Sequence, residues 1–170
     1  MANQSVAARL RRATPEDVPV ILELIHELAV YEREPDAVKN TVPVLTEQLF
    51  GQSPAIFAHV VEEEDGAEPT QIAGFALWFL NYSTWEGTHG IYLEDLYVRP
   101  AARGRGYGKT LLKELANIAV QRGYARVEWS VLKWNEPSIG FYRSIGAQPM
   151  DEWDTFRLTG PSLVDFGASA

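Results

Sequence analysis

Residues 103–109 read RGRGYGK, a glycine-rich stretch with three cationic side chains. A predicted strand at 91–98 precedes it, and apolar residues at helical spacing predict a helix over about 106–121. Glycine permits positive φ and a close approach of the backbone to a ligand. The first turn of a helix adds unpaired amide N–H groups and a positive partial charge. The stretch therefore predicts either a turn that binds an anion such as a pyrophosphate or, more simply, a turn with solvated arginines.

Two nucleotide-binding motifs agree with this stretch only in part. A Walker phosphate loop ends in Gly-Lys-Ser/Thr, as residues 108–110 do, but Arg103 stands where its leading glycine is required. A dinucleotide-binding fingerprint needs Gly-x-Gly-x-x-Gly after the first strand of a βαβ unit. Here the glycines follow as Gly-x-Gly-x-Gly, late in the chain and after a predicted antiparallel run. Spacing and position therefore argue against both motifs.

The hydrophobic pattern divides the rest of the chain into short strands and amphipathic helices. The first helix is predicted to begin at Thr14, because Pro15 suits its first position and Asp17 suits a capping box, and to end near 31–35. Residues 81–90 are expected to form a polar, flexible link. Strands are predicted over 8–12, 56–61, 71–80, 91–98, 126–132, 148–150 and 154–158, and further helices over 42–50, 106–121 and 137–144.

This order of elements predicts an α/β (α+β) fold. A run of antiparallel strands followed by strand–helix–strand units gives a mixed, mostly antiparallel sheet of about seven strands with helices on both faces. A chain of 170 residues with 46% hydrophobic content suits one globular domain. We expect that domain to span residues 1–170, with flexible ends at 1–6 and 167–170.

Composition narrows the possible ligands and locations. The net charge of −8 argues against nucleic acid as the main ligand and favours cationic small molecules, although solubility alone accounts for many acidic proteins. The chain has no cysteine, which excludes disulfides, thiolate metal sites and a cysteine nucleophile. The histidines show no metal-ligand spacing, so no metal is expected. No stretch has the roughly 20 apolar residues that span a bilayer, so we expect no membrane association and a cytoplasmic location.

The pattern Arg-x-x-Gly-x-Gly at residues 103–108 resembles the acyl-CoA pyrophosphate motif of the GNAT superfamily of N-acetyltransferases. The similarity runs from about residue 9 to residue 158 and is closer still to the diamine (spermidine/spermine) acetyltransferases. It is also carried by ELA at 27–29 with YE at 31–32, YLEDL at 92–96, WNEPS at 134–138, FY at 141–142, and Trp153 with Phe156. The resemblance implies a GNAT-like domain that transfers the acetyl group of acetyl-CoA to a primary amine. The implied acceptor is a small cation: a polyamine, a diamine or a thialysine-like amino acid.

The resemblance also implies roles for two side chains in proton transfer. An alkyl ammonium group titrates near ~10, so it must lose a proton before it attacks, and the leaving thiolate needs a proton donor. Glu94 is implied as the acceptor, through a water molecule, and Tyr142 as the donor. The alternative for Tyr142 is a core aromatic on a short amphipathic helix. Glu94 and Asp95 point to opposite faces of a regular strand unless a β-bulge re-aims one of them.

Contacts to both substrates follow from the same resemblance. The pantetheine arm of acetyl-CoA is expected to pair with the backbone of residues 96–98 as if it were a further strand. The residues implied in binding acetyl-CoA are Leu96, Tyr97, Val98, Arg103, Gly104, Arg105, Gly106, Tyr107, Gly108, Lys109, Asn135, Glu136, Pro137 and Ser138. Those implied in binding the amine are Tyr31, Glu32, Trp85, Glu94, Asp95, Glu128, Trp129 and Ser130. Carboxylates and aromatic rings suit a cationic amine, through ion pairs and cation–π contacts.

The loop before Trp85 departs from the polyamine enzymes. These carry an aspartate and a proline where Ser83 and Thr84 align, and this chain is one residue longer between Trp85 and Glu94. Loss of a carboxylate weakens the binding of a distal ammonium, so a thialysine-type amino acid or another short amine stays open beside spermidine and spermine. The alternative functions are a protein or antibiotic N-acetyltransferase and a non-catalytic acyl-CoA-binding regulatory module. The resemblance also implies a homodimer.

Overall fold

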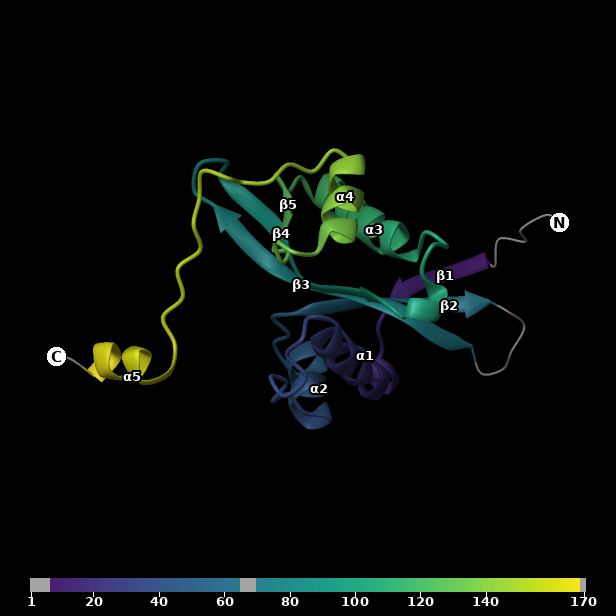
Figure 1. Ribbon diagram of the computed structural model, residues 1–170, viewed down its shortest axis with the longest axis horizontal. Helices are drawn as coiled ribbons and strands as arrows, with labels where there is room; N and C mark the ends of the chain where they lie inside the picture. Colours follow the sequence, from purple (N-terminus) through teal and green to yellow (C-terminus); the bar gives the residue numbers. More distant parts are fainter. Residues whose placement is uncertain (1–6, 65–69, 169–170) are drawn as a thin grey trace. The chain divides into compact units, whose positions relative to one another are not determined.

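Figure 1 shows the computed structural model, which describes residues 7–64 and 70–168. The part of the chain up to Ser130 and the part from Val131 form two compact units. The strands of the first unit are β1 (Ala7–Arg12), β2 (Phe57–Glu64), β3 (Gln71–Ser83), β4 (Thr88–Val98) and β5 (Val127–Trp129). Its helices are η1 (Pro15–Asp17), α1 (Val18–Tyr31), α2 (Val42–Phe50), η2 (Pro100–Ala102) and α3 (Tyr107–Arg122). The second unit holds α4 (Glu136–Ser144) and α5 (Gly160–Ala168).

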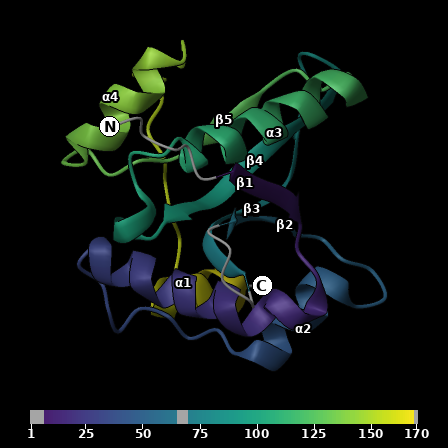
Figure 2. The same cartoon turned by 90° about the vertical axis from the view of Figure 1, so that its right-hand side faces the viewer.

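The first unit is built on one mixed sheet. Its strands lie in the order β1-β2-β3-β4-β5. Neighbours from β1 to β4 are antiparallel and β5 runs parallel to β4, which confirms the mixed, mostly antiparallel sheet. In Figures 1 and 2, α1 and α2 cover one face and α3 the other, which confirms helices on both faces.

The predicted strands over 148–150 and 154–158 are wrong. The structure gives both stretches an irregular backbone, so the described part of the chain has a five-stranded sheet rather than one of about seven strands. Pro149 cannot donate a ladder hydrogen bond. The N–H of Trp153 is already used in a turn, where it donates to the carbonyl of Met150 at 3.1 Å. The apolar residues of this segment are spaced as in a strand, but the backbone N–H groups that a strand needs for pairing are absent or already used.

One expectation of flexibility needs correction. The predicted flexible link at 81–90 instead extends the β3–β4 hairpin, whose ladder continues until Ser83 pairs with Thr88. Cross-strand pairing satisfies backbone groups that a polar composition alone suggested were solvated. Helix α5 includes the first two residues of the predicted flexible end at 167–170. The other two, and residues 1–6, lie outside the described residues.

The beginning of α1 is fixed by hydrogen bonds that join it to the sheet. The N–H of Thr14 donates to Asp17 Oδ2 at 2.7 Å and the N–H of Asp17 donates to the carbonyl of Thr14 at 3.0 Å. The predicted capping box is therefore confirmed. Arg11 donates to both carboxylate oxygens of Asp17, at 2.6 and 2.8 Å, and its Nε donates to Glu62 at 2.8 Å. These bonds hold the β1–α1 corner against β2.

The main core lies between the sheet and helices α1 and α2. The apolar stripe of α1, with Val18, Ile21 and Leu24, has no exposed surface and belongs to the same cluster as Val60 and Phe75. Each such side chain contributes roughly 1.5–3 kcal/mol when it leaves water. On the opposite face, α3 buries Tyr107, Leu111, Leu112, Leu115 and Ala119. The two layers fix the strand end and the turn that carry the candidate site.

Candidate active site

Strand β4 contains a β-bulge at Glu94. Asp95 pairs with Leu77 and Leu93 pairs with Trp78, so Glu94 is an extra residue opposite β3. A bulge bends its strand and re-aims the side chains beside it. Glu94 is exposed and Asp95 is half-buried. The strict alternation of a regular strand therefore does not apply to these two carboxylates.

Beyond the bulge, β4 has an open edge. β5 pairs with β4 only over 91–93, and no other strand of the described residues pairs on that side. The N–H of Arg99 donates to the carbonyl of Ala73 at 2.8 Å, so the backbone groups of Val98, the preceding residue, point away from β3. This edge offers an extended ligand the same hydrogen bonds that a further strand would make.

The glycine-rich turn leads from β4 into α3. Gly104 has φ 77° and Gly106 has φ 87°, a left-handed conformation that side chains disfavour. No side chain caps α3 at Gly106, so the first amide groups of this helix stay available. An added Cβ at either glycine would meet nothing within 4 Å, so the backbone there is open to a ligand. The prediction of an anion-binding turn thus agrees with its backbone geometry.

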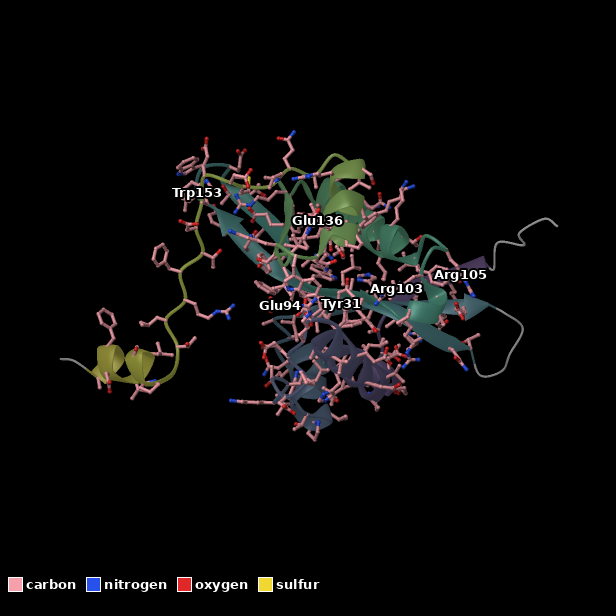
Figure 3. The ribbon with its side chains drawn as sticks, viewed as in Figure 1. Tyr31, Glu94, Arg103, Arg105, Glu136 and Trp153 are labelled. Carbon is pink, nitrogen blue, oxygen red and sulfur yellow. The ribbon has the colours of Figure 1, made fainter. Side chains whose placement is uncertain are left out.

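The two arginines of this turn reach different parts of the sheet. Arg103 Nε donates to the carbonyl of Val98 at 2.9 Å. Its guanidinium lies 5.0 Å from the ring centroid of Tyr31 and 5.4 Å from that of Tyr97, and Figure 3 shows Arg103 beside Tyr31. Arg105 instead forms an ion pair with a carboxylate of β2 at 2.7 Å. The alternative of a turn with solvated arginines is therefore incomplete, because both arginine side chains have partners in the protein.

Three carboxylates, Glu32, Glu94 and Asp95, form an acidic group where α1 ends against the bulge. Burial, followed by the charges of Glu94 and Glu32, raises the pKa of Asp95 to about 7. Burial also raises the pKa of Glu32. A cation bound here removes repulsion among the carboxylates and favours their charged forms. Perturbed carboxylates beside an open strand edge are typical of functional sites.

The predicted amine-binding residues near β5 take part in another network. Glu128 accepts a hydrogen bond from Asn81 Nδ2 at 2.7 Å and forms an ion pair with Arg126 at 2.9 Å. The hydroxyl groups of Ser130 and Tyr92 are hydrogen-bonded at 2.8 Å. These contacts join β5 to the β3–β4 hairpin.

Trp85 lies away from the acidic group within this chain. Its side chain is 88% exposed, in the turn that closes the β3–β4 hairpin. The bulge opposite Leu77 is about 20 Å further along β3, at ~3.3 Å per residue. Trp129 is half-buried and pairs with Leu93, just before the bulge. Of the predicted amine-binding side chains, the structure brings Glu32 and Asp95 together with Glu94, and it leaves Trp85 apart.

The second unit carries the remaining predicted residues. Asn135 caps α4, and its Oδ1 accepts a hydrogen bond from the N–H of Ser138 at 3.4 Å, as predicted. Glu136 begins the helix and is exposed. Tyr142 lies one turn and a half further along, half-buried, with its ring centroid 5.4 Å from that of Phe141. Tyr142 is therefore neither fully buried nor fully solvated.

One set of side chains beside the site was missed by the sequence reasoning. Glu23 and Glu27 on α1 both accept hydrogen bonds from Arg99, at 2.6 and 3.0 Å. The available signal was the spacing of four that places Glu23, Glu27 and Tyr31 on one face of the helix. Alone, that spacing is equally typical of a solvated helix face.

Histidine and the other common metal ligands are dispersed in the described residues. No group of three His, Cys, Asp or Glu within 7–64 and 70–168 is placed to hold a metal ion. His59 is buried, and its Nδ1 accepts a hydrogen bond from Trp78 Nε1 at 3.1 Å. Burial, with the nearby charge of Arg12, lowers the pKa of His59 to about 4, so the ring is neutral near pH 7. Over the same ranges, no helix combines the length and apolar character needed to cross a membrane.

Comparison with protein families decides the class. The model of the "Acetyltransferase (GNAT) family" matches residues 21–147, from α1 through α4. This chain belongs to the GNAT acetyltransferase family. It is therefore an N-acetyltransferase, of a family whose members use acetyl-CoA as co-substrate.

Relatives over nearly the whole chain act on small amines, according to their names. A "Thialysine N-epsilon-acetyltransferase" of Bos taurus is 36% identical over 91% of this chain and 94% of its own length. An "L-ornithine N5-acetyltransferase" of Arabidopsis thaliana is 34% identical over 92% of this chain and 86% of its own. Among solved structures, an integron cassette protein of V. cholerae has a TM-score of 0.78 at 25% identity, over 95% of this chain and 98% of that one. The GNAT-like α/β fold is thus confirmed.

Proposed function

We propose that this enzyme transfers the acetyl group of acetyl-CoA to the side-chain amine of a small cationic acceptor. Within that class, we propose amino acids such as thialysine and ornithine ahead of spermidine and spermine. The observation that carries the proposal is the acidic group Glu32, Glu94 and Asp95, at a bulge next to an open strand edge. An amine held by these carboxylates would lie beside the edge that suits the pantetheine arm.

The residues present fit acetyl-CoA, which supplies an activated thioester. The outward N–H of Val98 suits a carbonyl of the pantetheine arm, and the Val98 carbonyl, which accepts from Arg103 Nε, has a second lone pair for an amide N–H of that arm. The left-handed glycines and the uncapped start of α3 suit the pyrophosphate, with Arg103, Arg105 and Lys109 as cationic donors. On the second unit, residues 135–138 at the start of α4 are proposed as a further contact.

The proposed chemistry assigns one proton acceptor and one proton donor. Asp95 and Glu32 hold the acceptor's ammonium group, and Glu94 takes its proton through a water molecule. The freed nitrogen forms a bond to the acetyl carbon, and the carbon–sulfur bond breaks. The hydroxyl of Tyr142 gives its proton to the sulfur, and the proton that the nitrogen loses on becoming an amide restores the Tyr142 hydroxyl through solvent. Exposure of Glu94 supports its role, because a water molecule can reach it.

The preference for amino acids rests on the hairpin and on the relatives. Ser83 and Thr84 stand where the polyamine enzymes carry an aspartate and a proline. Ser83 is buried and its hydroxyl accepts a hydrogen bond from the N–H of Glu86 at 3.2 Å, so it cannot replace a carboxylate for a distal ammonium. The relatives named for thialysine and ornithine match this chain over most of their own lengths. The human spermidine/spermine acetyltransferase-like relative is 35% identical, but over 23% of its length.

The test is a coupled assay of the purified protein with acetyl-CoA and separate amines. Release of free CoA thiol would be followed with thialysine, L-ornithine, lysine, putrescine, spermidine, spermine and an aminoglycoside. We expect release with thialysine or ornithine and a loss of about a hundredfold or more in Tyr142→Phe, typical of a removed acid. Tight acetyl-CoA binding without release for any amine would instead favour a regulatory module or a protein substrate.

Two further properties complete the proposal. We propose a homodimer and a cytoplasmic location, both of which follow from the diamine-acetyltransferase resemblance and the composition rather than from a contact in the structure. Sedimentation of the purified protein would test the first, and fractionation of source cells the second. A monomer at the concentrations used for the activity assay would contradict the first.

A further inference from the structure

A stripe of three side chains on α1 faces the end of β4 and the glycine-rich turn. Glu23, Glu27 and Tyr31 recur every four residues, so they lie above one another on one face of the helix. Arg99 contacts the two glutamates, with Nη2 to Glu23 at 2.6 Å and Nε to Glu27 at 3.0 Å. The third member of the stripe, Tyr31, is contacted by Arg103. The helix is thus attached along its length to the region that follows the open edge.

Arg103 makes three contacts of two kinds within this region. Its Nε donates to the carbonyl of Val98 at 2.9 Å, and its guanidinium lies 5.0 Å from the ring of Tyr31 and 5.4 Å from that of Tyr97. Burial, followed by the charge of Glu27, raises the pKa of the Tyr97 hydroxyl. A planar guanidinium can donate and stack at the same time, which an ammonium group cannot do. Arg103 is therefore placed by both its plane and its charge.

Arg105 provides the internal comparison. It belongs to the same turn, two residues later, and has the same side chain. Its partner is Glu63, which lies on β2 rather than on α1, at 2.7 Å. If both arginines served only an anionic ligand, their variants would have the same effects. The structure distinguishes them, because Arg103 alone of the two contacts the helix that ends at the acidic group.

The position of Tyr31 links its contact with Arg103 to the acidic group. Tyr31 is the last residue of α1, and Glu32 follows it. The charge of Glu32 acts on Asp95 across the gap between α1 and β4. A shift of the end of α1 would therefore change the spacing of the acidic group.

We propose that Arg103 is a positioning residue for the amine acceptor: it fixes the end of α1, with Tyr31 and Glu32, against the cofactor edge of β4. The inference rests on the proposed function of the acidic group as the amine site. It predicts that this arginine of the cofactor turn sets the KM for the amine as well as the KM for acetyl-CoA.

The test compares Arg103→Gln, Arg103→Lys and Arg105→Gln in the full chain. With L-ornithine or thialysine as acceptor, Arg103→Gln is expected to raise the amine KM about fivefold at saturating acetyl-CoA, which corresponds to the loss of cation–π contacts at an exposed site. Arg103→Lys keeps the charge over the rings but not the planar donor, so its amine KM should lie between those of Arg103→Gln and the wild type. Arg105→Gln should raise only the acetyl-CoA KM. Thermal unfolding of each variant shows whether it is folded. If Arg103→Gln does not fold, the amine KM of Arg103→Lys is compared with that of the wild type instead.

A double-mutant cycle gives the second readout. Tyr31→Leu should raise the amine KM in the wild type, and should add less than threefold in Arg103→Gln, because the contact is already lost. Full additivity would overturn the inference, as would an amine KM unchanged in both Arg103 variants. Either result, obtained with an active wild type, leaves the proposed acetyltransferase function standing. A wild type inactive with every amine would overturn both.

Discussion

The two adjacent carboxylates of β4 show what a sequence can and cannot settle for a single residue. The pair stands out in the sequence because an apolar strand rarely carries two acids, and both were predicted as site residues. Their directions depended on a bulge that no turn residue or glycine marks. The structure places the extra residue at Glu94 and leaves Asp95 half-buried beside Glu32. The two residues of the site were therefore predictable from the sequence. The raised pKa of Asp95 was not predictable, because its burial and the approach of α1 are tertiary effects.

Asp95 is expected to reduce the stability of the folded protein near neutral pH. Its pKa is about 7 in the fold, mainly through burial, against about 3.9 in an unfolded chain. An acid with a raised pKa binds its proton more tightly when folded, so stability falls as pH rises from about 4 to 7. Asp95→Asn should therefore stabilise the protein at pH 8 by about 2 kcal/mol, and by almost nothing at pH 3.5. Urea unfolding at both values checks this, with the exposed Glu86→Gln as control; a destabilised Asp95→Asn at pH 8 would refute it.

The pH dependence of activity should report the same carboxyl. If Asp95 must be charged to hold the ammonium group, kcat/KM for the amine should increase as pH rises through about 7. Burial is the main cause of that pKa, and the charges of Glu94 and Glu32 add to it. Glu32→Gln should therefore move the acidic limb of the profile to lower pH. Profiles for wild type and Glu32→Gln provide the measurement, and a limb at the same pH in both would show that Asp95 does not control it.

At the scale of elements, local signals were sufficient for α1 to α4, but they were insufficient for α5, which was not predicted, and for the ends of the strands. The capping box at Thr14 predicted the start of η1, which leads directly into α1, and the cap at Asn135 predicted the start of α4. The hairpin was underestimated because residues 81–90 are polar, although they continue the ladder. The strands predicted over 148–158 failed because strand formation needs a partner, which periodicity does not supply. Pairing is a non-local property, and only the structure shows it.

The extended hairpin leaves little room for a side chain at Gly90. A Cβ there would lie 2.5 Å from Asn81 Oδ1 and 2.8 Å from Arg126 Cγ, within the network that joins β5 to the hairpin. Gly90→Ala should destabilise the protein by about 1–3 kcal/mol, as overpacking does. Gly140 is the matched control: it lies inside α4, a Cβ there meets nothing within 4 Å, and alanine should stabilise by roughly 0.5–1 kcal/mol. Chemical unfolding of both variants is the measurement, and equal effects would contradict the packing argument.

For the whole molecule, the net charge of −8 and the acidic group point to the same kind of acceptor. A negative protein attracts a cationic amine over a distance, and salt screens that attraction. We expect kcat/KM for the amine to fall as sodium chloride is raised from about 20 to about 500 mM. The decline should be steeper for spermidine than for ornithine, because spermidine carries more positive charge. Initial rates at low amine concentration provide the test, and equal slopes for the two acceptors would argue against electrostatic attraction.

The family assignment was also available from the sequence, because the glycine-rich turn and the YLEDL and WNEPS segments are specific in combination. The choice of acceptor could not be predicted from the sequence, since it depends on a missing carboxylate in the hairpin and on the spacing of the acidic group. That choice is the central claim. The most direct measurement is kcat/KM for L-ornithine, thialysine and spermidine in one assay, with the acetylated position determined by mass spectrometry. We predict acetylation of the side-chain amine, with ornithine or thialysine preferred over spermidine; a preference for spermidine, or acetylation of the α-amine, would contradict it.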